Sequence, residues 1–297
     1  MIKDQDPEHH AEVSLESFVT PLGTMALNPK TDAKMVRSFR QGIYPNASLI
    51  RFARSVTTSS STVVDIGAHI GTFTVPMAGS VKSVIAFEPA PDTIPLLRDN
   101  CKNNGVQVDI RTVGLGRVPG SASVETRKEE NAGANTLVRG GDIRICTLDS
   151  EVPAADFIKI DVEGMEMEVL EGGTELIARS HPIVFFEVNL SQLRAHGTSP
   201  KALETFFKEK NYLLYYLLEK DSEQGSLSRV DDLSLLTACI APRAWLFRGE
   251  SAPFDIIAIP AGTDVPYTIV GFGAALMRAL KHNLAIKVQR IKKAFHV

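Results

Sequence analysis

From Thr62 to Pro260 the chain alternates short apolar runs with segments of helical period. The apolar runs lie at 62–66, 83–88, 108–115, 156–161, 183–188, 212–219 and 254–260, and the helical segments between them at 71–80, 90–105, 165–180 and 199–212. Strand-like runs that alternate with helices are typical of parallel βαβ units. The pattern therefore predicts an α/β fold with a seven-stranded, doubly wound sheet whose final strand is an antiparallel insertion.

Three regions depart from this alternation. Between Gly116 and Asp149 no helical period is present, and residues 121–127 and 142–148 have the pattern of a strand pair. We therefore expect a small β insertion before the fourth strand. The flanking regions divide the chain into a lead-in over 1–60 that packs on the core, a main domain over 61–260 and a C-terminal amphipathic helix within 261–297.

Composition narrows the class of protein. The 297 residues are 44% hydrophobic with a formal net charge of -3, which argues against bulk attraction to nucleic acid. The three cysteines are far apart in sequence, so neither a disulfide framework nor a zinc site is indicated. The first twenty residues contain no apolar signal-peptide core, and no apolar run is long enough to cross a bilayer. We expect a cytoplasmic protein.

The C-terminal region is basic. Residues 261–297 contain six Lys or Arg side chains and one acid, Asp264. A basic amphipathic helix can lie on an anionic membrane surface, which would make this a peripheral membrane contact. Alternatively it packs on the domain or on a second subunit with its charges solvated, as most charged helix faces are. The oligomeric state stays open.

The segment "VVDIGAHIGTF", Val63 to Phe73, ends the first predicted strand and begins a helix. Ligands of such sheets bind at the carboxyl ends of the strands, and glycine allows a ligand to approach the backbone closely. Dinucleotide folds use GxGxxG, whereas Gly67 and Gly71 form GxxxG after Asp65. A carboxylate at Asp65 would repel a pyrophosphate and attract the ammonium group of S-adenosylmethionine.

A second acid follows the second strand. In "AFEP", Glu88 lies 17 residues after Gly71, about where a carboxylate binds ribose hydroxyls. Each acid alone would be explained by a strand-end turn, but the two together with the glycines favour an adenosyl ligand. The candidate cofactor-binding residues are Asp65, Gly67, Ala68, His69, Gly71, Thr72, Phe73, Glu88, Pro89 and Gly114.

These motifs resemble the FkbM family of S-adenosylmethionine-dependent methyltransferases. The resemblance covers about residues 40–190 and is most specific at "KIDVEGMEMEVLEG" after the fourth strand. It implies a Rossmann-like class I methyltransferase fold and methyl transfer to an oxygen, often on a sugar or a natural-product hydroxyl. His69 stands where the family usually has Asn, and its imidazole can donate a hydrogen bond as the amide does. The tyrosine of "GIYPN" lacks the acid that often follows it, so a role of the lead-in in substrate binding does not carry over.

Catalytic candidates follow the fourth predicted strand. Side-chain alternation places Lys159, Asp161 and Glu163 on one side of the extended segment. A hydroxyl nucleophile must lose its proton, and a positioned carboxylate can accept it. We expect Asp161 to be the base or substrate-orienting acid, with Glu163 second. The alternative is that Glu163 caps the next helix and Lys159 pairs with an acid in the fold.

A metal site and a closing loop are further alternatives. Asp161, Glu187 and Asn189 supply the oxygen ligands that Mg²⁺ prefers, although three such residues at strand ends are common without an ion, and no metal is predicted. Gly133–Leu137 in the insertion either closes over the pocket or is a surface turn.

The leading hypothesis is an O-methyltransferase that acts on a hydroxyl of a sugar, glycolipid or secondary metabolite. Its partner is then a small-molecule or glycan acceptor and not a nucleic acid. Alternatives are a catalytically silent module that binds an adenosyl ligand, a methyltransferase that acts on another nucleophile, and a nicotinamide-dependent oxidoreductase. The GxxxG spacing and Asp65 weigh against the oxidoreductase.

Overall fold

The computed structural model describes residues 14–125, 136–218, 225–242, 246, 253–281 and 283. Residues 1–13, the segment 133–135 of the proposed closing loop, and residue 282 and residues 284–297 of the predicted C-terminal helix lie outside the described residues.

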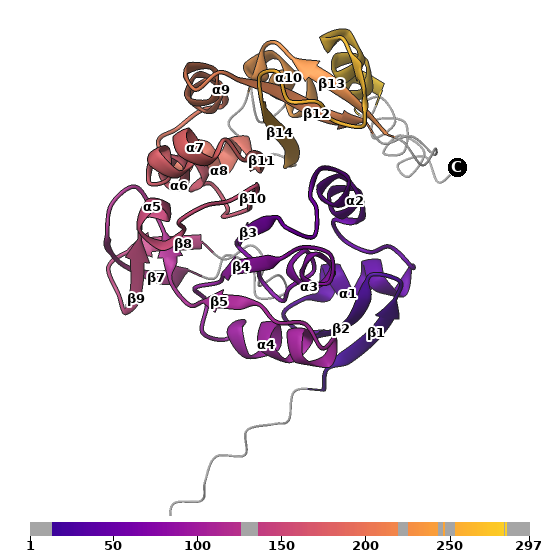
Figure 1. Cartoon of the computed structure of the whole chain (residues 1–297), viewed down its shortest axis with the longest axis vertical. Helices are drawn as coiled ribbons and strands as arrows, with labels where there is room; N and C mark the ends of the chain where they lie inside the picture. Colours follow the sequence, from indigo (N-terminus) through magenta and orange to yellow (C-terminus); the bar gives the residue numbers. More distant parts are fainter. Residues whose placement is uncertain are drawn as a thin grey trace, which may run out of the picture.

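A mixed sheet forms the centre of the molecule (Figure 1). Within the described residues it has nine strands rather than the predicted seven, because two short strands extend one edge. In spatial order they are β15 (Thr268–Val270), β13 (Ser226–Val230), β12 (Tyr212–Leu218), β14 (Phe254–Pro260), β11 (Ile183–Val188), β10 (Phe157–Ile160), β3 (Thr62–Ile66), β4 (Ser83–Phe87) and β5 (Asp109–Arg111). The added strands β13 and β15 are short, and polar residues interrupt their apolar pattern, so periodicity did not reveal them.

The strand directions place the ligand-binding edge. β3 pairs in parallel with β4 on one side and with β10 on the other. The strands that follow β3 directly in the chain therefore lie on one side of it, and the later strands lie on the other. This is the topological switch point at which open α/β sheets bind ligands. β14 runs antiparallel to both β11 and β12, which confirms the predicted antiparallel insertion.

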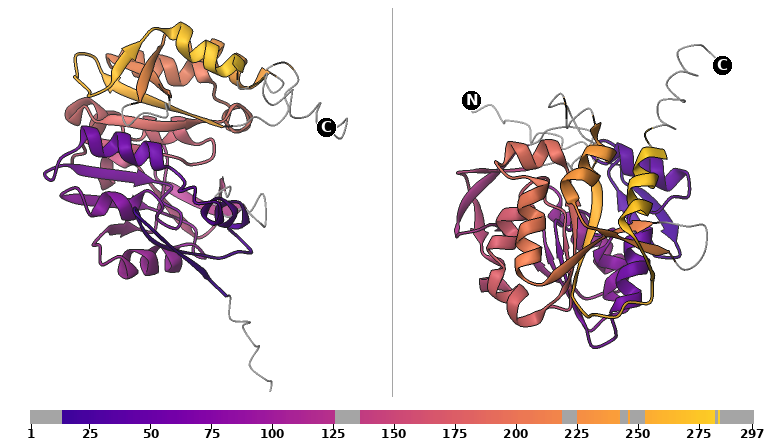
Figure 2. Two further views of the ribbon diagram at one scale, coloured as in Figure 1. Left: turned by 90° about the vertical axis from the view of Figure 1, so that its right-hand side faces the viewer. Right: turned by 90° about the horizontal axis from the view of Figure 1, so that it is seen from above.

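Helices cover both faces of the sheet (Figure 2). Val63 packs with α2 (Ala47–Val56) and α3 (Thr74–Ala78), whereas the next residue, Val64, packs in the cluster that contains α6 (Glu166–Glu171), α7 (Thr174–Ser180), α9 (Pro200–Glu209) and α10 (Leu233–Ile240). Alternate strand residues thus enter different cores, which is why the runs are apolar throughout. The short helix α8 (Leu190–Ala195) follows β11.

The helix predicted over 165–180 is two helices, α6 and α7. It breaks at Gly172 and Gly173, where other segments approach too closely for a side chain. A Cβ at Gly172 would lie 2.1 Å from the carbonyl oxygen of Gly116, and one at Gly173 would lie 2.6 Å from Leu148 Cδ2. The break therefore results from packing against the segment that leads into and out of the β insertion.

The lead-in is joined to the main sheet by side-chain amides. It contains a hairpin of β1 (Glu16–Thr20) and β2 (Gly23–Leu27), then α1 (Ala33–Arg40) and α2, and β2 lies against α4 (Ile94–Asn103). Asn100 accepts from the backbone N–H of Ala26 (2.8 Å) and donates to the carbonyls of Ala26 (3.1 Å) and Ile70 (2.9 Å). Because Asn100 is buried, it ties the lead-in to the loop after β3.

The insertion forms its own sheet. Its spatial order is β6 (Gly114–Leu115), β9 (Ile143–Cys146), β7 (Gly120–Glu125) and β8 (Thr136–Arg139), followed by the short helix α5 (Leu148–Glu151). The predicted strand pair is present as β7 and β9, which are antiparallel. The predicted run 108–115 is divided, with β5 in the main sheet and β6 in the small one.

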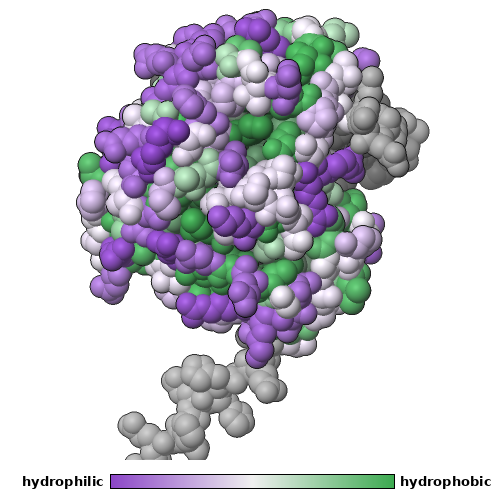
Figure 3. All heavy atoms as spheres, in the orientation of Figure 1, coloured by the Kyte–Doolittle hydropathy of each residue, from purple (hydrophilic) through white to green (hydrophobic). Residues whose placement is uncertain are grey.

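The surface is mixed in polarity, and the chain is helical near its C-terminal end. On the face drawn in Figure 3, hydrophilic residues are interspersed with small hydrophobic patches. Residues 272–281 are helical, in the region where the amphipathic helix was predicted. None of the described helices combines the length and apolar character that crossing a bilayer requires.

Candidate functional site

A cavity opens at the carboxyl ends of β3, β4 and β10, next to the small sheet. It encloses about 630 Å³, a volume that includes the open space at its mouth. Its lining consists of Ile66, Gly67, His69, Phe87, Glu88, Pro89, Ala90, Val113, Gly114, Leu115, Val124, Thr136, Leu137, Asp161, Val162, Glu163 and Met165. The site thus draws on the ends of the first four predicted strands and on the insertion.

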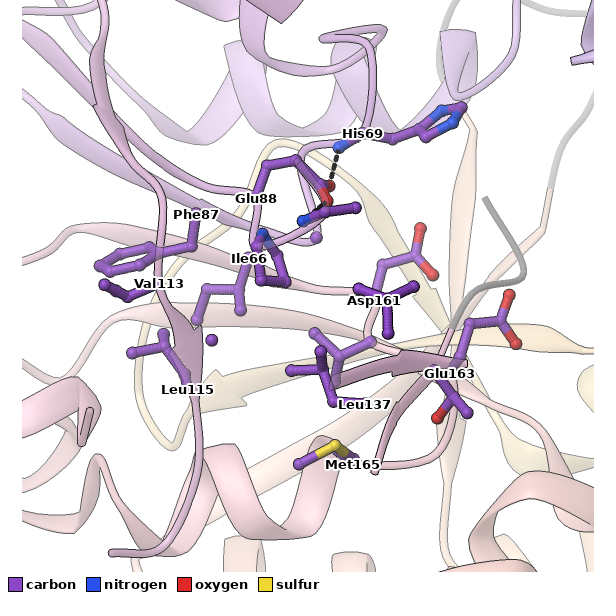
Figure 4. A pocket seen from close by; sticks show the side chains of 17 residues that line it. Ile66, His69, Phe87, Glu88, Val113, Leu115, Leu137, Asp161, Glu163 and Met165 are labelled. Atoms are coloured by element: carbon purple, nitrogen blue, oxygen red, sulfur yellow. Dashed lines mark hydrogen bonds between the residues drawn. The ribbon is translucent and has the colours of Figure 1, made fainter. Parts of the chain in front are cut away.

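The cavity has an apolar side and an acidic side (Figure 4). Ile66, Phe87, Val113 and Leu115 gather on one side, and Asp161 and Glu163 lie on the other. The apolar side was largely missed from sequence, because Val113 and Leu115 belong to a run that was interpreted only as a strand. Such a division suits a ligand with a flat apolar part and a cationic or hydroxyl-bearing part.

The carboxylate of Glu88 connects the loop after β3 with the loop after β4. Its Oε2 accepts from the backbone N–H of His69 (2.8 Å) and its Oε1 from that of Ala90 (2.9 Å). Burial, the largest influence, raises the pKa of Glu88, and the two N–H donors oppose it. An ionised carboxylate can accept about four hydrogen bonds, so capacity remains for two ligand hydroxyls.

Contacts within the protein require glycine at both positions of the loop, Gly67 and Gly71. Gly67 has φ +80°, and a Cβ there would lie 1.9 Å from the carbonyl oxygen of Asp161. Gly71 has φ +91°, and its Cβ would lie 2.9 Å from Leu97 Cδ1 on α4. We expected both to permit approach of a ligand. The close approach is instead made by the end of β10 and by α4, although Gly67 also lines the cavity.

We expected Asp65 to face a ligand, but it does not line the cavity. It is 0% exposed, and its two oxygens contact Lys159 Nζ (Oδ1, 3.1 Å) and the hydroxyl of Thr74 (Oδ2). The carboxylate is therefore already neutralised within the protein, and a ligand ammonium group would not meet it directly. The alternative that Lys159 pairs with an acid in the fold is confirmed.

Lys159 links the loop to the cavity. Its Nζ lies 3.1 Å from the carbonyl oxygen of Gly67 and 3.3 Å from Asp161 Oδ2. Burial would lower the pKa of Lys159, but Asp65 and Asp161 outweigh that effect and raise it, so the ammonium stays charged. Asp161 is 37% exposed and lines the cavity, so one buried cation orients the carboxylate that faces a ligand.

The rest of the loop supports this arrangement. Ala68, Thr72 and Phe73, three of the predicted cofactor residues, are buried and do not line the cavity. His69 lines the cavity with φ +50°, and its Nε2 lies 3.2 Å from Asp32 Oδ1 of the lead-in. No sequence signal pointed to Asp32, which precedes α1 and is buried. Pro89 and Gly114, also candidate cofactor-binding residues, line the cavity.

The segment after β10 is a tight loop. Glu163 has φ +53°, lines the cavity and accepts from Gln192 Nε2 (3.4 Å). Gly164 has φ +104°, and a Cβ there would lie 2.8 Å from Gln192 Cβ on α8. Contact with α8 therefore fixes the loop that presents Asp161 and Glu163.

Two further carboxyls lie near this acidic side. Burial raises the pKa of Glu166 to about 7, with its charged neighbour Asp161 adding to the shift. Burial also raises the pKa of Glu187 to about 10, with Asp161 and Glu163 next in effect. Glu166 was missed, although it lies in the most specific part of the recognised motif. Among the residues that the structure describes, no group of three His, Cys, Asp or Glu side chains is placed to hold a metal. Asn189, the third oxygen ligand considered for Mg²⁺, accepts a hydrogen bond from the hydroxyl of Ser191 through Oδ1 (2.8 Å).

Comparison with known proteins bears on the family. A hexuronic acid methyltransferase, AglP, of Haloferax volcanii is 31% identical over 153 residues, which cover 49% of this chain and 60% of that protein. Methyltransferase 1 of Beauveria bassiana is 28% identical over 144 residues, 38% of this chain and 58% of that protein. The match thus spans about three fifths of the length of each of these relatives.

The chain also resembles a solved structure and matches a family model. The crystal structure of methyltransferase FkbM from Methylobacillus flagellatus is 18% identical with a TM-score of 0.41, covering 62% of this chain and 45% of that one. The model of the methyltransferase FkbM domain matches residues 65–214, half of the 297-residue chain, and includes the loop after β3, Glu88 and the acids after β10. The chain belongs to the FkbM methyltransferase family.

Proposed function

We propose that this protein transfers the methyl group of S-adenosylmethionine to a hydroxyl oxygen of a sugar, glycolipid or secondary metabolite. The observation that carries the proposal is the cavity in which Glu88, at the end of β4, and Asp161, at the end of β10, face the same space. Family membership supports methyl transfer as the reaction.

The cavity fits the cofactor by its chemistry. Glu88 retains acceptor capacity for two ribose hydroxyls, and Phe87, Val113 and Leu115 form an apolar surface for an adenine ring. The carboxylates of Asp161 and Glu163 suit the positive charge of the methionine part. When bound, S-adenosylmethionine would supply an electrophilic methyl group at a sulfonium centre.

Asp161 is the proposed proton acceptor. Its carboxylate is held by Lys159 and is partly exposed to the cavity, so an acceptor hydroxyl can donate a hydrogen bond to it and lose its proton there. Glu163, on the adjacent loop, is the proposed second acid that orients the acceptor. Fixing the hydroxyl between these groups supplies orientation, which accounts for much of the rate gain in reactions of two bound partners.

The acceptor class rests on the relatives. The Haloferax volcanii protein is named as a hexuronic acid methyltransferase, which supports a sugar hydroxyl as the acceptor. The mixed polar and apolar lining is consistent with such a group, and no metal ion is part of the proposal.

Calorimetric titration with S-adenosylhomocysteine tests the cofactor site. Glu88→Gln removes an acceptor oxygen and the negative charge, and hydrogen bonds to charged groups contribute about 1.5–3 kcal/mol. We expect an affinity at least about tenfold weaker than wild type. Asp92→Asn, an exposed acid four residues further on, is the matched control and should bind as wild type does.

Thermal unfolding of both variants checks that the loop still folds. Equal binding by folded Glu88→Gln would remove Glu88 from the site. A folded wild-type protein that binds no S-adenosylhomocysteine would contradict the proposed function as a whole.

A further inference from the structure

A second cavity lies beside the first. It encloses about 540 Å³ including its mouth, and its polar lining consists of Arg117, Glu168, Glu171, His196 and Thr198. These residues come from the start of the insertion, from α6 and from the segment between α8 and α9. None of them was a candidate site residue in the sequence.

The two cavities share a wall. Along the chain, Leu115 lines the first cavity and Arg117, two residues on, lines the second. In the loop after β10, Gly164 lines the second cavity, whereas its neighbours Glu163 and Met165 line the first. Two separate backbone segments therefore have one side toward each cavity.

A side-chain contact makes the third part of this wall. Thr136 Oγ1, in the first cavity, lies 3.4 Å from His196 Nε2, in the second. A ligand in the second cavity would thus lie next to the loop that presents Glu163 to the first cavity. That is where the unreactive part of a methyl acceptor must be held.

The donor and acceptor groups of the second cavity suit hydroxyls. Arg117 and Thr198 can donate, and Glu168, Glu171 and Thr198 can accept. A hydroxyl group is both donor and acceptor, so a polyhydroxylated ring can use both kinds of partner. Met167 and Ala202 add apolar surface for the carbon face of such a ring.

Charge argues against an acidic ligand. Among the described residues that line the two cavities, Arg117 is the one Lys or Arg side chain, and the carboxylates are Glu88, Asp161, Glu163, Glu168 and Glu171. Arg117 is already paired, because its Nε lies 2.5 Å from Glu171 Oε2. A ligand carboxylate would therefore meet an excess of like charge, and the one guanidinium is shared with Glu171.

We propose that the second cavity binds the non-reacting part of the methyl acceptor, and that this part is an uncharged polyhydroxylated group such as a neutral sugar. The inference rests on the proposed function. It implies that the chain prefers a neutral sugar to an acidic one. Glu171 determines this preference, because it pairs with Arg117.

Methyl transfer to paired glycosides tests the inference. The probes are the methyl glycosides of glucose, galactose and mannose and the matching uronides, each incubated with full-length protein and labelled S-adenosylmethionine. We expect kcat/KM for the best neutral glycoside to exceed that for its uronide by at least about tenfold. Glu171→Gln should release Arg117 and remove one carboxylate, so KM for the uronide should fall about fivefold relative to KM for the neutral glycoside.

Matched variants keep the outcomes distinct. Glu175→Gln changes an exposed acid one turn further along the chain and should behave as wild type, and Asp161→Asn is the transfer-negative control. A wild-type preference for uronides, no transfer to any glycoside, or an unchanged ratio of the two KM values in Glu171→Gln would each overturn the inference. S-adenosylhomocysteine binding is measured on the same samples, and its absence would instead mark failure of the proposed function.

Discussion

Lys159 is the residue on which the geometry of the site depends most directly. Its ammonium contacts Asp65 below the loop, the carbonyl of Gly67 within it and Asp161 in the cavity. Both Lys159 and Asp65 are almost completely buried. Breaking a buried pair by removing one partner is costly because the other charge is left without compensation.

Replacement of this cation should destabilise the protein. We expect Lys159→Met to lower the free energy of unfolding by about 3–5 kcal/mol, measured by urea denaturation. Lys82→Met, at an exposed lysine, should change it by less than about 0.5 kcal/mol. Adding Asp65→Asn to Lys159→Met should recover part of the loss, and a loss below about 1 kcal/mol for Lys159→Met would contradict the importance of the pair.

At this scale the sequence predicted the right residue types but not their partners. Alternation along the strand correctly indicated that Lys159 and Asp161 lie together. It gave no reason to turn Asp65 toward Lys159 rather than toward a ligand, because β3 and β10 are far apart in sequence and pair only in the fold. Local sequence pattern could not predict the contact between Asp32 and His69 either, because the two residues are also far apart in sequence.

At the scale of elements, strands followed the sequence more closely than helices did. The predicted runs 62–66, 183–188 and 254–260 coincide with β3, β11 and β14, since burial on both faces makes a strand apolar from end to end. Helix ends were less predictable. The segment 71–80 is helical only over Thr74–Ala78, because Gly71 adopts a positive φ.

The turn between β3 and α3 offers a test of this packing. Gly67→Ala combines a positive φ, which costs about 1–2 kcal/mol, with overpacking against Asp161, which costs about 1–3 kcal/mol. Gly105→Ala is the matched control, because it has φ +64° and nothing within 4 Å of the added Cβ.

We expect both variants to lose stability in thermal unfolding, with the larger loss for Gly67→Ala. The difference between them measures the close approach of the β10 end alone. Equal losses would mean that backbone conformation, and not the contact with Asp161, requires glycine at this position.

At the scale of the whole molecule, acids concentrate at one edge of the sheet and make stability depend on pH. A carboxyl with a higher pKa in the folded than in the unfolded chain binds more protons when folded, so the free energy of unfolding falls as pH rises between the two values. For Glu166 that window runs from the ordinary carboxyl pKa of 4.5 to about 7. For Glu187 it extends to about 10.

Stability should therefore decrease from pH 5 to pH 8. We expect Glu166→Gln, which mimics the protonated acid, to remove about 3 kcal/mol of that decrease in urea denaturation across this range. Glu209→Gln, at an exposed position, should leave the decrease unchanged. A wild-type protein whose stability rises over this range would contradict the assignment of buried, protonated acids.

The placement of β14 has a consequence for how the chain folds during synthesis. This strand lies between β11 and β12, yet residues 254–260 leave the ribosome after both of its neighbours. Until then two apolar strand edges have no partner, and such edges are sites of aggregation. Completion of the sheet must wait for the last of its central strands, so these two edges are exposed for longer during synthesis than the edges that pair earlier strands.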